Sequence, residues 1–124
     1  MIRPLAAAAL GAALAAVPAL AETGTQAPGA VLRWLDKIAG TTGDLELSRG
    51  QVAQAGQGGR LTILLDDCRY PAEGTPTDAF AHLVIHDSLR NATLFSGWML
   101  AEAPALNALD HHRYDVWVLR CLTE

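Results

Sequence analysis

Apolar and polar residues alternate along several short stretches of the chain, a pattern typical of β-strands that turn one face toward a core. The clearest case is residues 44–48, where Leu45 and Leu47 alternate with polar neighbours and are expected to face inward. Residues 31–38 fit a helix as well, but their length and the glycine that follows favour a strand. The further strands predicted in this way are 51–55, 60–68, 79–87, 93–101 and 114–121.

The segment 93–101 is apolar on both faces. A period of two places Trp98 on one face, and Phe95 and Met99 on the other. Such a strand is usually covered on both sides, so we expect LFSGWM (94–99) to belong to the core. If one face is uncovered, Trp98 with Phe95 or Met99 would form a partner-binding patch.

The other strands predict which side chains share a face. The segment 60–68 is expected to be buried on both sides as far as Asp66. Two alternating sets in 79–87 are Ala81, Leu83 and Ile85 on one side, and Phe80, His82, Val84 and His86 on the other. In 114–121 the sets are Trp117, Leu119 and Cys121, and Val116 and Val118.

The predicted strands are joined by segments rich in glycine, proline and asparagine, among which 104–109 should form one short helical turn. Six or seven short strands at regular spacing predict an all-β domain, a small sandwich or barrel.

The N-terminus has the order of a secretory signal peptide: Arg3, an apolar run from 5 to 17, and small residues before a cut ahead of Glu22. Retention as a membrane anchor is the alternative, because the stretch from Pro4 to Leu20 is about as long as the shortest spans, roughly 17 residues. We expect residues 1–21 to be cleaved, 22–29 to be a flexible linker and 30–124 to be one β domain, with no membrane span after cleavage. The predicted location is the periplasm.

The charge of the chain argues against a nucleic-acid partner. Without residues 1–21, eight Arg and Lys face thirteen Asp and Glu, a net charge of −5. Nucleic acids and anionic membranes favour clustered basic residues, and this sequence has no such cluster.

Both cysteines, Cys68 and Cys121, lie in the predicted mature part. An even count in an exported protein favours a disulfide. A redox pair is the alternative, but redox-active thiols usually lie close together in sequence.

Candidates for chemistry are few. Asp110, His111, His112 and Asp115 offer enough ligands for a metal site or a hydrolase-type enzyme. Adjacent histidines on an extended chain point apart, however, so a polar loop is the plainer interpretation. His82 and His86 lie about 13 Å apart along one strand and cannot share an ion. The pair Asp66-Asp67 could serve acid–base chemistry only if both groups met in one cleft.

The stretches LDKIAG (35–40), LFSGWM (94–99), PALNALDH (104–111) and YDVWVLRC (114–121) together resemble the bacterial family called domain of unknown function 2155. The resemblance implies an exported α-proteobacterial protein with a shared disulfide and no established reaction. The family's genes often lie near one for an accessory subunit of respiratory NADH dehydrogenase, which implies association with a membrane complex. Glu102-Ala103 replace the family's Ser-Ser, and His112 replaces its proline.

These observations favour a non-catalytic binding module over an enzyme. The expected partner is an envelope protein or a membrane complex, and no cofactor is indicated. The candidate binding residues are Phe95, Trp98, Met99 and Trp117.

Overall fold

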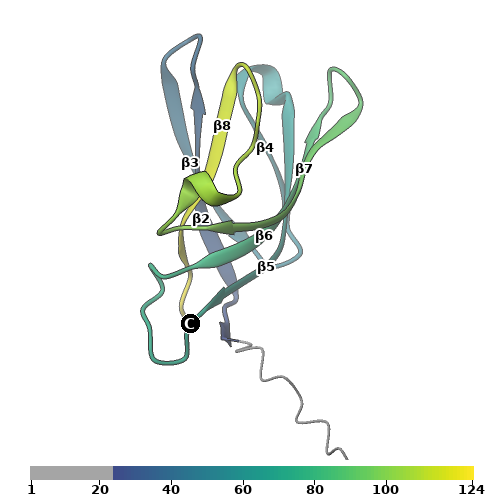
Figure 1. Cartoon of the computed structure of the whole chain (residues 1–124). Helices are drawn as coiled ribbons and strands as arrows, with labels where there is room; N and C mark the ends of the chain where they lie inside the picture. The colour runs from purple at the N-terminus through teal and green to yellow at the C-terminus, as the bar shows by residue number, and fades with distance from the viewer. Residues whose placement is uncertain (1–23) are drawn as a thin grey trace, which may run out of the picture.

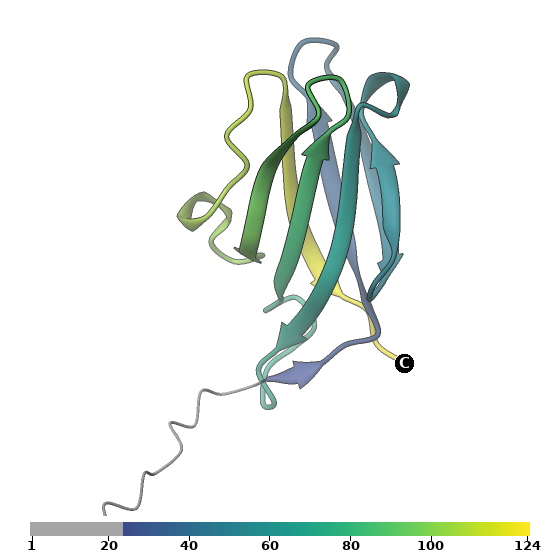
Figure 2. The same ribbon diagram turned by 90° about the vertical axis from the view of Figure 1, so that its right-hand side faces the viewer.

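The computed structural model describes residues 24–124, which form two antiparallel β-sheets packed face to face (Figures 1 and 2). The predicted signal peptide and the first residues of the predicted linker lie outside the described residues. The strands are β1 (Thr25–Gln26), β2 (Gly29–Asp36), β3 (Thr41–Ser48), β4 (Val52–Ala55), β5 (Leu61–Tyr70), β6 (Phe80–Asp87), β7 (Ala92–Leu100) and β8 (Tyr114–Cys121). Two 3₁₀ turns, η1 (Gln57–Gly59) and η2 (Pro104–Leu106), are the helical elements of this part of the chain. No helix among residues 24–124 is long and apolar enough to cross a membrane.

The sheets differ in width. The larger one has the order β1-β5-β6-β7, with β4 also paired to β5, and the smaller one has the order β3-β2-β8. The all-β prediction is therefore confirmed, and the arrangement is a sandwich. The additional strand is β1, which lies within the stretch predicted to be a linker and pairs with Arg69 and Tyr70.

Alternation along each strand decides which side chains fill the core between the sheets. In β6, Ala81, Leu83 and Ile85 are fully buried, as predicted. The segment 60–68 differs from its prediction, because only one face of β5 is buried. Leu64 on the other face is partly exposed, since no third layer of described residues covers the larger sheet. The continuous apolar sequence of 60–68 therefore predicted burial of both faces, whereas one face is buried.

A β-bulge near the end of β5 and another near the end of β8 turn both cysteines inward. The extra residue is Asp66 in β5 and Leu119 in β8. Each bulge reverses the alternation that follows it. Cys121 therefore lies on the core side with Val118, and its predicted place beside Trp117 is wrong.

The disulfide between Cys68 and Cys121 is formed, with Cα atoms 5.9 Å apart and both residues fully buried. It joins β5 of the larger sheet to β8 of the smaller one. The bond therefore fixes the two layers to each other at the end of the sandwich where β5 and β8 finish.

Removal of this bridge is expected to destabilise the domain. Its cysteines are 53 residues apart, and a loop of that length corresponds to roughly 4 kcal/mol in the chain-entropy treatment. A Cys68→Ala/Cys121→Ala variant should lose about that much free energy of unfolding in urea titrations at pH 7. A loss below about 1 kcal/mol would contradict this account.

Candidate functional site

The outer face of the larger sheet carries an aromatic cluster centred on Trp98. This side chain is 39 % exposed on β7. Its ring lies 5.2 Å from the ring of His82, edge-on, and 5.7 Å from the ring of Phe80. His82 is the direct cross-strand neighbour of Trp98 in the β6–β7 register. We call Phe80, His82, Trp98 and Leu100 the Trp98 face.

Neighbouring residues extend the apolar character of this surface. Leu100 is 38 % exposed, and Val84 and Leu64 on the adjacent strands are half-buried. The contacts with Phe80 and His82 hold the Trp98 ring against the sheet. The Trp98 face is therefore an ordered apolar surface.

The structure separates the four residues predicted to bind a partner. Met99 is buried in the core, and Phe95 packs against the core from the same side of β7. Trp117 lies on the smaller sheet, where it lines a pocket of about 230 Å³ with Pro104 and Leu109. The core prediction for LFSGWM is thus right for Met99 and wrong for Trp98, and Trp98 forms its patch with Phe80 and His82.

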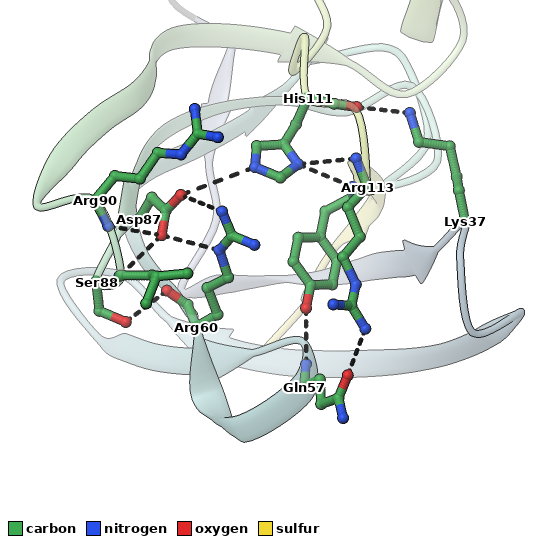
Figure 3. A network of polar contacts seen from close by, with 10 residues as sticks. Lys37, Gln57, Arg60, Asp87, Ser88, Arg90, His111 and Arg113 are labelled. Atoms are coloured by element: carbon green, nitrogen blue, oxygen red, sulfur yellow. Dashed lines mark hydrogen bonds and ion pairs between the residues drawn. The ribbon is translucent and has the colours of Figure 1, made fainter.

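The end of the sandwich where β2 and β6 finish contains a network of buried polar groups (Figure 3). Asp87, the last residue of β6, is fully buried and accepts hydrogen bonds from Arg60 Nε and Nη2 at 3.1 and 2.9 Å. The backbone N–H of Leu89 donates to the same carboxylate at 2.9 Å. A buried charge needs such partners. Arg60 is the main reason that the pKa of Asp87 lies well below its usual range.

Asp36, the last residue of β2, is held in the same way. Arg113 donates to it from Nε and from Nη2, the latter at 2.8 Å. The backbone N–H groups of Ile38 and Ala39 donate to it at 3.0 Å. These bonds, the Arg113 bonds above all, lower the pKa of Asp36 to about 2. Both carboxylates are therefore ionised and fix an arginine each.

His111 and Tyr114 fill the space between these ion pairs. His111 Nδ1 accepts hydrogen bonds from the backbone N–H of Arg113 and of Tyr114 at 3.0 and 3.1 Å. The ring proton is therefore on Nε2, which lies 3.9 Å from Asp87 Oδ2 and has no hydrogen-bond partner among the described residues. Burial lowers the pKa of His111, so that the neutral ring is favoured. Tyr114 is fully buried, and its hydroxyl oxygen accepts from the backbone N–H of Gln57 at 3.0 Å.

The candidate metal ligands do not converge. His111 points inward, whereas His112 is exposed and stacks on the His111 ring with centroids 4.5 Å apart. Asp115 pairs with Lys37 at 3.2 Å, and Asp110 is exposed. Within residues 24–124, no group of three His, Cys, Asp or Glu side chains could hold a metal ion.

The paired carboxylates of the sequence, Asp66 and Asp67, also have separate surroundings. Asp66 is exposed and lies beside His82. Asp67 accepts hydrogen bonds from Arg69 and Gln26. The two carboxylates therefore have different partners, and nothing among the described residues pairs them with each other for acid–base chemistry.

Comparison with known proteins identifies the family. The model of a family described as uncharacterised proteins conserved in bacteria, DUF2155, matches residues 30–121. The chain belongs to this family. No curated protein and no solved structure gives a significant match.

The DUF2155 match begins in β2 and ends at Cys121, so it includes both cysteines and both buried ion pairs. Sequence reasoning missed the ion pairs. One signal was present: Asp87 continues the inward-facing series of Ala81, Leu83 and Ile85. An aspartate at an inward position predicts a buried partner of opposite charge.

The Asp36–Arg113 pair should make stability depend on pH in acid. The pKa of Asp36 is about 2 in the folded chain and about 3.9 in an unfolded chain, so its contribution is complete above pH 4. As the pH falls from 4 through 2, protonation removes that contribution. In urea titrations, the difference in unfolding free energy between wild type and Asp36→Asn should be constant from pH 5 to 7 and shrink below pH 4.

A matched substitution, Asp110→Asn, replaces an exposed aspartate and should change stability little at any of these pH values. If the wild type and Asp36→Asn differ equally at pH 6 and pH 2.5, the pair does not act as described.

Proposed function

We propose that this DUF2155 domain is a non-catalytic binding module, exported to the periplasm, that docks an envelope protein or a membrane complex through the Trp98 face. The observation that carries the proposal is the exposure of Trp98 at the centre of an ordered aromatic cluster.

The physical argument concerns the free energy of association. Tryptophan is among the residues that contribute most to protein interfaces, because it has a large apolar area and few rotatable bonds. Phe80 and His82 already restrict the Trp98 ring, so docking would order little that is mobile. Half-buried Val84 and Leu64 would extend the contact beyond the cluster.

Two features support export. The N-terminal sequence has the order of a signal peptide ending ahead of Glu22. The buried disulfide suits an oxidising compartment, because disulfides in reducing compartments are rarely structural.

Substitution of Trp98 should abolish docking. We would crosslink a C-terminally tagged chain mildly in its native envelope fraction and identify captured proteins by mass spectrometry. Trp98→Ala should lose a partner that wild type captures in stoichiometric amount. Trp117→Ala removes the same side chain from the other sheet and should retain the partner.

Both variants must show wild-type thermal unfolding within a few degrees, so that loss of binding is not loss of fold. Equal capture by wild type and folded Trp98→Ala would contradict docking through this face. Equal loss in both variants would contradict it as well.

Export should produce a defined mature N-terminus. The intact mass of the protein in the periplasmic fraction should equal that of a chain beginning at Glu22 and lacking two hydrogens for the disulfide. A chain that retains residues 1–21, or that stays in the cytoplasmic fraction, would contradict the proposed processing.

A further inference from the structure

A pocket of about 390 Å³ opens at the sandwich end that holds the two ion pairs. Arg60 and Arg113 both line it, together with Tyr114, Gln57 and Ser88, and no carboxylate does. The partners of the arginines, Asp87 and Asp36, are 0 % and 1 % exposed. The negative charges are therefore buried behind the pocket wall, and the positive charges form part of its surface.

Each of the two guanidinium groups is held by an aspartate on one side, through Nε and Nη2, which leaves Nη1 for another partner. Arg60 uses Nε and Nη2 to bind Asp87, and Arg113 uses Nε and Nη2 to bind Asp36. Arg113 Nη2 also donates to the side-chain oxygen of Gln57. No hydrogen bond within residues 24–124 involves Nη1 of either arginine. Figure 3 shows both arginines at this end of the sandwich, with Gln57 near them.

The two like charges lie near enough to repel each other. The charge of Arg113 acts to lower the pKa of Arg60, although the hydrogen bonds to Asp87 outweigh it. Arg113 Cζ lies 5.3 Å from the centre of the Tyr114 ring, and Tyr114 lines the same pocket as both arginines. An anion in the pocket would relieve this repulsion. Its N–H donors are already fixed in the folded chain, so that binding would cost little conformational entropy.

We propose that this pocket binds a small ligand through an oxyanion group, a carboxylate or a phosphate, held by Nη1 of Arg60 and of Arg113. Arginine suits this role because its planar array of N–H groups matches the spacing of carboxylate and phosphate oxygens. Tyr114 and Ser88 also line the pocket, and Ser88 Oγ donates to the backbone oxygen of Arg60 at 2.8 Å. The volume falls in the range typical of small-molecule sites, roughly 300–1,000 Å³.

This site is separate from the Trp98 face. His82 and Asp87 lie five residues apart on β6, about 17 Å along the strand. Failure of either proposal would leave the other standing.

The test is a titration of the isotopically labelled protein at low ionic strength. Inorganic phosphate and glutarate would be added separately, and the backbone amide of Gln57 and the Nε–H signals of Arg60 and Arg113 would be followed by NMR. We expect saturable shifts of these signals with at least one of the two anions. Shifts that are linear in concentration and spread over the whole surface for both anions would overturn the proposal.

Gln57→Glu gives the sharpest variant. It places a carboxylate in the pocket wall, its oxygen can still accept from Arg113 Nη2 as Gln57 does, and Asp36, Asp87 and both arginines are left unsubstituted. The negative charge at position 57 would repel the anion and should weaken its binding at least about tenfold. The control is Gln51→Glu, which has the same net charge, lies outside the pocket wall and should bind as wild type does. Equal affinity in both variants would overturn the proposal, and the NMR spectra report whether each is folded.

A sedimentation assay with phosphatidylglycerol vesicles distinguishes the sources of the oxyanion. Vesicle binding that Gln57→Glu abolishes would assign the site to a lipid headgroup. Saturable binding of phosphate or glutarate without vesicle binding would assign it to a free small molecule.

Discussion

The pairing of two buried aspartates with two arginines determines how one end of this domain is built. Asp36 and Asp87 are the final residues of β2 and β6, at positions whose alternation directs them into the core. A carboxylate there is tolerated only with charged and backbone donors around it. Arg60 and Arg113 supply the charges, and the turns after each strand supply the N–H groups. His111 and Tyr114 belong to the same network, because His111 accepts from the backbone of Arg113 and Tyr114, and Tyr114 accepts from the backbone of Gln57.

The two ends of the sandwich are thus held by different chemistry. At one end, ion pairs connect strand ends and loops, and at the other a disulfide joins the sheets through cysteines that two bulges turn inward. Between these ends the wider sheet buries only one of its faces. The aromatic side chains on its other face are therefore partly exposed. The proposed binding role of the DUF2155 domain depends on this exposure.

Local pattern predicted the strands well. Alternation placed Ala81, Leu83 and Ile85 in the core, and the continuous apolar run of β5 gave the right element with the wrong burial. What the pattern could not predict depends on distant residues. A bulge reverses the alternation for every later residue, so Cys121 faced the opposite way from its prediction. The number of layers decides whether Trp98 is covered, and a sequence with two apolar faces does not specify that number.

The candidate sites show the same limit. His111 and His112 are adjacent in sequence, yet one is buried beside Asp87 and the other is exposed. The pairs Asp87–Arg60 and Asp36–Arg113 join residues that are 27 and 77 positions apart, and no motif marks such separations. The net charge of the sequence gave no indication of the arginine pocket either. Asp36 and Asp87 compensate the charges of its two arginines, and the chain as a whole is mildly acidic.

The most direct test of the central claim is photocrosslinking in living cells with a photoreactive amino acid at single positions. Leu100, 38 % exposed, belongs to the Trp98 face, and Leu106, 76 % exposed, lies on η2. A binding module that docks through the Trp98 face predicts a discrete crosslinked species from position 100 and none of that mass from position 106. The same adduct from both positions, or from position 106 alone, would contradict the account.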